Sequence, residues 1–294
     1  MDHLQTILGK PVTDPEEEAF VVFSQHGPSH QSLGFIDSKA AAIELSVAGR
    51  DLTIHHSRGL LTSDRKQGTT GAVVWKVTPL FADWIASSNF LSAAGYLSTE
   101  TVALELGAGV AGIVALTLAP SISRYIATDQ HYVLRILKQN ISDNLPNNAT
   151  TSAKRASSRT KRSQPLNQPN LPCIETFEWD WEWDASSLPP LLHQGRDTAN
   201  VGVDLVITCD TVYNDALIEP LNNTCANICR LRSADPHRRP TLCLVAQQLR
   251  SPEVFESWLK SFHSLFHVWR VPDKLLTPPL RENSGFTVHV GILR

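Results

Sequence analysis

Apolar positions recur at two spacings along the chain, every second residue in some stretches and every third or fourth in others. Residues 41–59 contain two alternating runs that flank the turn-forming "AGRD" of residues 48–51, which predicts a β-hairpin. From Gly71 the spacing becomes helical, so we expect a helix ahead of the core sheet. Its buried face should carry Leu80, Phe81, Trp84 and Ile85.

A strand, a glycine turn, a helix and a second strand then follow one another. Residues 101–106 ("TVALEL") form a short apolar run, residues 111–119 have helical spacing, and residues 124–129 ("RYIATD") predict the next strand. This order is that of a βαβ unit. A further helix is expected over residues 130–145, and its inner face should carry Val133, Leu134, Leu137 and Ile141.

The rest of the chain repeats this alternation after one interruption. Strands are predicted within 173–184, 203–214 and 241–248, helices over about 215–231 and 251–262, and two last strands around 267–271 and 285–293. No helical pattern separates the last two strands, so they should form an antiparallel hairpin at the edge of the sheet. The fold class is therefore α/β with a mostly parallel sheet.

The interruption lies at residues 146–172. This stretch is rich in Asn, Ser, Thr, Pro and basic residues and almost devoid of large apolar ones, which predicts a disordered insertion. Its "KRASSRTKR" (154–162) is either a solvated loop or a nuclear-localisation or nucleic-acid patch. The chain carries a net charge of −3, so removing the five basic residues of this stretch leaves −8 for the remainder. An acidic remainder favours a basic partner, with an unpartnered acidic surface as the alternative.

Cysteine usage and the start of the chain restrict the class of protein further. The five cysteines are scattered and include no C-x-x-C pair, so we expect buried free thiols and neither disulfides nor a metal site. These are Cys173, Cys209, Cys225, Cys229 and Cys243. No apolar stretch is long enough to cross a membrane and no signal peptide is evident, so we expect a cytoplasmic location, with the nucleus as a second one.

Candidate chemistry begins at the glycine turn, where Gly107, Gly109 and Gly112 have the spacing G-x-G-x-x-G. Asp129, about twenty residues further on, could accept hydrogen bonds from ribose hydroxyls. These features fit both a dinucleotide and S-adenosylmethionine. Glu105 favours the latter, because a carboxylate beside the glycines would repel a pyrophosphate but would tolerate a sulfonium and an ammonium.

Three motifs occur in one order: "GAVVW" (71–75), "ELGAG" (105–109) and "DTVY" (210–213). With them the chain resembles the seven-β-strand S-adenosylmethionine-dependent methyltransferases, and among these the methyltransferase-like 21 group and fungal ribosomal lysine methyltransferases. The resemblance covers roughly residue 43 to the C-terminus. It implies a Rossmann-like seven-stranded sheet with an antiparallel C-terminal edge hairpin, built from residues 71–294, and an N-terminal extension over 1–70 that contains the β-hairpin.

The resemblance also implies individual roles. Trp75 would close over the cofactor, the backbone of the glycine turn would hold its amino-acid part, and Asp129 would hold its ribose. The expected cofactor-binding residues are Trp75, Glu105, Gly107, Ala108, Gly109, Asp129, Trp181 and Cys209. From sequence alone Trp75 could equally be a core aromatic residue.

The segment "FEWDWEWD" places three tryptophans at alternating positions on an expected strand end, so they should share a face. Trp181 is our choice for the residue that packs on adenine, and Trp179 is the second. The expected catalytic residues are Asp210 and Tyr213, which would orient the substrate amine. For Asp210 a helix N-cap is the alternative.

The expected activity is therefore protein-lysine N-methylation of a large-subunit ribosomal protein with S-adenosylmethionine. Another protein substrate, such as an elongation factor or chaperone, and a catalytically silent binding module are the alternatives. A Rossmann oxidoreductase would need a Tyr-x-x-x-Lys or an equivalent His, which we do not find near the expected site. Methylation of nucleic acid or a small molecule is disfavoured because "CDTVYN" stands where an N-P-P-Y-like turn would be. We expect a monomer that binds a basic protein and neither a membrane nor nucleic acid.

Overall fold

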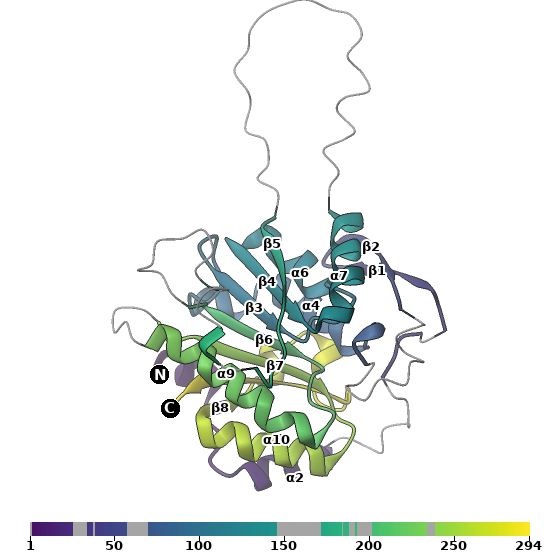
Figure 1. The fold of residues 1–294 in the computed structure, drawn as a ribbon. Helices are drawn as coiled ribbons and strands as arrows, with labels where there is room; N and C mark the ends of the chain where they lie inside the picture. The colour runs from purple at the N-terminus through teal and green to yellow at the C-terminus, as the bar shows by residue number, and fades with distance from the viewer. Residues whose placement is uncertain are drawn as a thin grey trace, which may run out of the picture.

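The computed structural model describes residues 2–25, 34–37, 39–57, 70–145, 172–183, 185–187, 192, 202–233 and 239–294. The insertion predicted at residues 146–172 lies outside the described residues except for its last position. Within the described part, seven strands form one mixed sheet in the order β5-β4-β3-β6-β7-β9-β8 (Figure 1).

Five neighbouring strands of this sheet run parallel. They are β5 (Ile174–Glu178), β4 (Arg124–Asp129), β3 (Val102–Leu106), β6 (Leu205–Cys209) and β7 (Leu242–Gln248). β9 (Phe286–Leu293) is antiparallel to both β7 and β8 (Phe266–Arg270). The predicted α/β fold and its antiparallel C-terminal hairpin are therefore confirmed. The sequence did not reveal that β9 inserts between β7 and β8, which leaves β8 at the edge.

Helices cover both faces of the sheet (Figure 1). One face carries α4 (Val77–Ala86), α6 (Ile113–Leu118) and α7 (His131–Asn144), and the other carries α2 (Pro15–Gln25), α9 (Ile218–Ser233) and α10 (Pro252–Leu265). Two shorter helices are α1 (Asp2–Leu8) and α5 (Phe90–Ala93). Because β3 and β6 are covered on both faces, every residue in them is buried, which is why each appears as a short continuous apolar run.

The predicted helix faces agree with the structure closely. Phe81, Trp84 and Ile85 of α4 are buried, and Leu80 is only partly buried. All four apolar residues predicted for the inner face of α7 are buried as well. Asn140, a polar residue on the same helix, is fully buried too, and the apolar pattern could not have indicated it.

Asn140 fastens the N-terminal hairpin to the sheet. This hairpin consists of β1 (Ala42–Val47) and β2 (Arg50–His55), as predicted. The Asn140 Oδ1 accepts from the His55 amide at 2.8 Å, and its Nδ2 donates to the carbonyls of His55 at 2.9 Å and Val110 at 2.7 Å. Through this side chain the hairpin is tied to Val110 within the glycine turn. The domain boundary at residue 70 stays a prediction.

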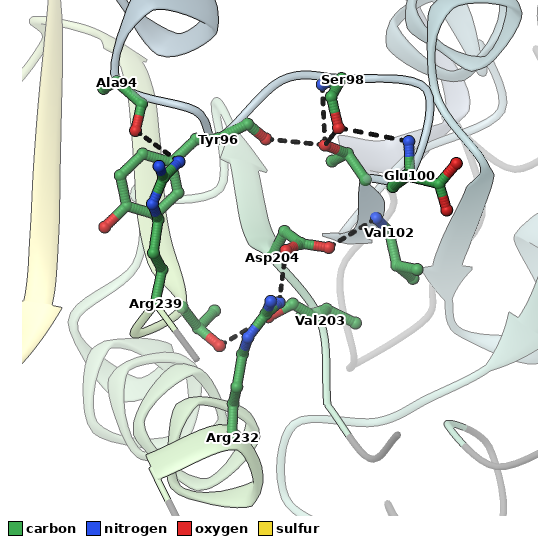
Figure 2. Close-up of polar contacts among 11 residues, drawn as sticks. Ala94, Tyr96, Ser98, Glu100, Val102, Val203, Asp204, Arg232 and Arg239 are labelled. Atoms are coloured by element: carbon green, nitrogen blue, oxygen red, sulfur yellow. Dashed lines mark hydrogen bonds and ion pairs between the residues drawn. The ribbon is translucent and has the colours of Figure 1, made fainter. Parts of the chain in front are cut away.

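A partly buried ion pair joins elements at the amino end of the sheet, as Figure 2 shows. Asp204 directly precedes β6, and its Oδ1 lies 2.6 Å from Nη1 of Arg232 in the last turn of α9. Its Oδ2 accepts from the Val102 amide at 2.8 Å, where β3 begins. Nearby, Thr241 donates to the Val203 carbonyl and Arg239 donates to the Ala94 carbonyl. This network fixes the starts of β3 and β6, at the end opposite to the site described next.

Candidate active site

A pocket opens at the carboxyl ends of β3, β4 and β6, which is where ligands bind in open α/β sheets. All ten residues predicted for the site line it: Trp75, Glu105, Gly107, Ala108, Gly109, Asp129, Trp181, Cys209, Asp210 and Tyr213. We call it the cofactor pocket. The structure therefore brings together residues that lie up to 138 positions apart in the chain.

The glycine turn forms the floor of the cofactor pocket. Gly107 has a φ of +75°, and a Cβ there would lie 2.8 Å from Cγ2 of Thr211 and 3.1 Å from the Trp181 ring. Gly112, with a φ of +60°, begins α6, and a Cβ there would lie 2.9 Å from Leu137. Glycine is therefore needed at the first position for the pocket wall and at the last for packing against α7.

Glu105 places a buried carboxyl group in the pocket wall. Its side chain is 2% exposed and accepts a hydrogen bond from the Tyr125 hydroxyl at 2.7 Å. Burial raises the pKa of Glu105 to about 7; the Tyr125 hydrogen bond lowers this pKa, and the charge of Asp129 raises it further. The group is therefore divided between its protonated and ionised forms near neutral pH, and a cationic ligand would favour the ionised form.

Asp129 ends β4 and faces the same pocket. Its Oδ2 accepts from the Gly109 amide at 2.8 Å, and its Oδ1 accepts from the Gln130 amide at 2.7 Å. Burial raises the pKa of Asp129 to about 6, although both backbone hydrogen bonds lower it. Each oxygen keeps acceptor capacity beyond its one backbone bond, so the carboxylate can receive hydroxyl donors of a ligand.

The three tryptophans of "FEWDWEWD" do not share a strand face, and that prediction is wrong. β5 ends at Glu178, so the alternation of a strand does not extend to them. Trp179 is buried, and its ring lies 5.8 Å from that of Trp183, which is 45% exposed. Trp181 packs against Gly107 instead. Both Trp179 and Trp181 line the cofactor pocket, so the choice between them for the adenine contact stays open.

Asp210 has both of its carboxylate oxygens engaged. Arg250 donates to Oδ1 at 2.7 Å and to Oδ2 at 2.6 Å, and the Gln248 amide donates to Oδ1 at 3.2 Å. The side chain of Asp210 is fully buried, and its φ is +59°. The N-cap alternative does not apply, since Asn214 caps the short helical turn that follows. Arg250 was missed because nothing in the local sequence pairs it with a residue 40 positions away.

Tyr213 and Cys209 complete the predicted set. The Tyr213 hydroxyl hydrogen-bonds the Thr70 side chain, and burial raises its pKa. Cys209 donates to the Thr78 hydroxyl at 3.8 Å. Burial, together with the charges of Glu105 and Asp210, raises the pKa of Cys209 well above its ordinary value, so it stays a thiol. The other cysteines are buried as expected, apart from Cys173, which is exposed; all five are free thiols.

Further residues line the cofactor pocket that the sequence did not single out, among them Gln130 and Thr211. Gln130 Oε1, Trp179 Nε1 and Thr211 Oγ1 are each buried and have no hydrogen-bond partner in the described part of the chain. Buried polar atoms normally find partners. Three such atoms on one pocket fit a polar ligand that supplies the missing donors and acceptors.

Comparison with known proteins bears on what that ligand is. The family described as lysine methyltransferase matches residues 55–158, which include the glycine turn and Asp129. The chain is similar to lysine methyltransferases over these residues. S-adenosylmethionine is accordingly the cofactor, and the residues present fit it. The Glu105 carboxyl suits an ammonium, Asp129 suits the ribose, and the tryptophans suit a flat base.

Individual relatives span different shares of their own length. Two named ribosomal lysine N-methyltransferase 5, from Zygosaccharomyces rouxii and Vanderwaltozyma polyspora, are each 29% identical over 71% and 78% of this chain and 70% and 76% of theirs. A Schizosaccharomyces pombe relative, named as a diaminohydroxyphosphoribosylamino-pyrimidine deaminase, is 25% identical over 87% of this chain. The chain spans only about half of that relative, 53% of its length.

The described residues lack two other kinds of feature. No helix there is long and apolar enough to cross a membrane. No group of three or more His, Cys, Asp or Glu side chains in the same residues could hold a metal ion.

Proposed function

We propose that this protein transfers the methyl group of S-adenosylmethionine to the ε-amino group of a lysine in a large-subunit ribosomal protein. The observation that carries the proposal is the cofactor pocket itself, in which the buried Glu105 carboxyl and the partly buried Asp129 carboxyl flank a glycine turn. The identity of the substrate is supported by the names of the yeast relatives and by the acidic charge of the chain outside its basic insertion.

When bound, S-adenosylmethionine supplies a methyl group activated by a sulfonium. The lysine nitrogen would take this methyl group, and the electron pair of the broken carbon–sulfur bond would stay on sulfur. Only a neutral amine has the lone pair for this attack, and free lysine has a pKa of about 10.4, so the ammonium proton must first leave to water. No covalent intermediate with the protein is needed.

The chain's own residues would bind the cofactor, orient the incoming lysine and exclude water. Glu105 would bind the cofactor's ammonium, and Asp129 would bind its ribose hydroxyls. Tyr213, on the loop after β6, would face the incoming lysine and restrict its approach. The buried walls would keep bulk water away and strengthen these polar contacts, and in-line alignment would supply most of the rate enhancement.

Labelling tests this proposal directly. Protein mixed with tritiated S-adenosylmethionine and an extract from cells that lack the enzyme should label one protein band, of the large ribosomal subunit. Asp129→Ala should leave the extract unlabelled, whereas Glu44→Gln, an exposed acid on the hairpin, should label it as the wild type does. We expect the enzyme in the cytoplasm, where ribosomal proteins are synthesised, with the nucleus as a second location.

The possible results separate the parts of the proposal. Label in RNA or in a small molecule would overturn lysine methylation. Label in an elongation factor or chaperone would overturn only the choice of substrate. A protein that binds NAD at micromolar concentration and does not bind S-adenosylhomocysteine would overturn the choice of cofactor as well.

A further inference from the structure

Arg250 stands directly behind the cofactor pocket. Arg250 is not among the described residues that line this pocket, but it contacts Asp210 and Trp75, which do line it. Its guanidinium makes the two bonds to Asp210 described above and lies 4.8 Å from the ring centroid of Trp75, the geometry of a cation–π contact. A planar donor fork satisfies the carboxylate while its face remains available to the indole ring.

Trp75 is connected through Thr70 to Tyr213, on the substrate side of the pocket. The Trp75 Nε1 donates to the carbonyl of Thr70 at 3.0 Å, and the Thr70 side chain hydrogen-bonds the hydroxyl of Tyr213. A shift of the Trp75 ring would therefore move the partner of Tyr213 as well. The Arg250 guanidinium thus affects the positions of both Trp75, a predicted cofactor contact, and Tyr213, a predicted substrate contact.

Residues 34–37 pack against Trp75 and its two neighbours in the chain. The Lys76 amide donates to the Gly34 carbonyl at 2.8 Å, the Ile36 amide donates to the Val74 carbonyl at 3.2 Å, and the Phe35 ring lies 4.5 Å from that of Trp75. Gly34 has a φ of +89°.

A Cβ at Gly34 would lie 2.6 Å from Nη2 of Arg250 and would also overlap the side-chain oxygen of Gln248. The backbone at residue 34 therefore rests against the guanidinium group. No larger residue fits between the segment and Arg250 unless one of these side chains moves.

We propose that Arg250 is a positioning residue, which holds Trp75 and residues 34–37 beside the cofactor pocket and through which Asp210 acts. We call Asp210, Arg250, Trp75 and residues 34–37 the Arg250 clamp. The direct contact between Asp210 and the substrate amine predicted from the sequence is replaced by this indirect role. The Asp210 side chain is fully buried and both of its oxygens accept from Arg250, so little of the carboxylate is available to an amine. The ligand invoked here rests on the proposed function, whereas the clamp itself does not.

Two measurements test the clamp. Calorimetric titration with S-adenosylhomocysteine measures cofactor affinity, and amide hydrogen exchange at Ile36 and Lys76 measures docking of residues 34–37. Arg250→Met should weaken affinity about tenfold and speed exchange at both amides, because the cation over Trp75 is lost. Arg250→Lys keeps a cation but not the bidentate fork, so it should restore affinity to within about threefold of the wild type.

A double variant tests whether Asp210 works through Arg250. Arg250→Met alone strands a buried carboxylate, so Asp210→Asn with Arg250→Met should fold better than the single variant. If the two residues act as one unit, the double variant should bind S-adenosylhomocysteine within about twofold of Arg250→Met. If the losses of affinity from the two substitutions multiply in the double variant, Asp210 makes a contact of its own and the indirect role is overturned.

The matched control is the second Asp–Arg pair flanking β6. Asp204 and Arg232 approach to the same 2.6 Å at the opposite end of that strand (Figure 2). Arg232→Met should lower the melting temperature while leaving S-adenosylhomocysteine affinity and exchange at Ile36 and Lys76 within about twofold of the wild type.

The proposal is overturned if Arg250→Met retains both cofactor affinity and slow exchange, or if Arg232→Met reproduces its effects. Failure of the wild type to bind S-adenosylhomocysteine would instead overturn the proposed function. The exchange measurement would still decide on the clamp in that case, because it needs no ligand.

Discussion

Glu105→Gln should stabilise the free protein at alkaline pH while weakening its cofactor binding. Glutamine keeps an oxygen that can accept the hydrogen bond from Tyr125, at 2.7 Å in the wild type, but it carries no charge to bury. The ionised wild-type carboxylate lies in a wall where it is 2% exposed, so its charge opposes folding until a cation binds beside it.

The magnitude follows from the difference between two pKa values. In the unfolded chain the pKa of Glu105 is its ordinary 4.5, and in the folded protein it is raised to about 7. A raised pKa means that this group's contribution to stability is fully present below pH 4.5 and is lost as the pH rises through about 7. At 1.36 kcal/mol per pKa unit the loss amounts to about 3 kcal/mol.

Urea unfolding of the free protein at pH 5 and pH 8 measures this loss. The unfolding free energy of the wild type should fall between these pH values by about 2–3 kcal/mol more than that of Glu105→Gln. Glu44→Gln, which removes an exposed carboxylate, should follow the wild type. Calorimetry with S-adenosylmethionine should show wild-type affinity rising from pH 6 to pH 8 and a weaker, flatter response in Glu105→Gln. If wild type and Glu105→Gln lose stability in parallel, Glu105 is not protonated near neutral pH and the reasoning fails.

Three further predictions concern the turn, the ribose contact and the hairpin. Gly107→Ala should prevent S-adenosylhomocysteine binding, because its Cβ would collide with Thr211. In the control Gly49→Ala, at a φ of +70°, the Cβ has no atom within 4 Å, so urea unfolding should show only the backbone strain of about 1 kcal/mol. Asp129→Ala should weaken S-adenosylhomocysteine binding about tenfold or more by removing the acceptor of the ribose hydroxyls, and unchanged affinity in a calorimetric titration would contradict that role. Asn140→Ala should lower the unfolding free energy by about 3 kcal/mol, because it leaves three buried or part-buried backbone groups without partners. A loss below about 1 kcal/mol would mean that the other contacts of the hairpin, among them the hydrogen bonds of Asn144 with Thr53, are sufficient to hold it.

The local chemistry of the site could be predicted from the sequence. Strands β3, β4 and β6 are apolar runs that end in "ELGAG", in Asp129 and in "CDTVY". Parallel strands connected by helices end at one edge of a sheet, so residues placed directly after them must meet. This is why eight of the ten predicted residues line one pocket, whereas Trp75 and Trp181, which line it too, lie elsewhere in the chain and their roles came from the family resemblance.

The prediction from the sequence was wrong where alternating spacing continues beyond the end of a strand. The tryptophans of "FEWDWEWD" keep a period of two, but β5 ends at Glu178, and a turn at residues 181–182 separates the buried Trp179 from the exposed Trp183. Period-two spacing predicts a shared face only while the backbone stays extended. Where a strand ends is decided by the neighbour with which it can pair, which here is β4.

Apolar periodicity and turn residues together determined the α/β fold, the hairpin and the position of the cofactor pocket, because burial of a helix stripe or a strand is a property of neighbouring residues. Only the tertiary structure decided that Asp210 meets Arg250, that Asn140 holds the hairpin, and that β9 enters between β7 and β8. A buried charge or amide must be satisfied by whatever group the packed chain brings within about 3 Å. That distance bears no fixed relation to separation along the sequence, so these partners could not be identified before the fold was known.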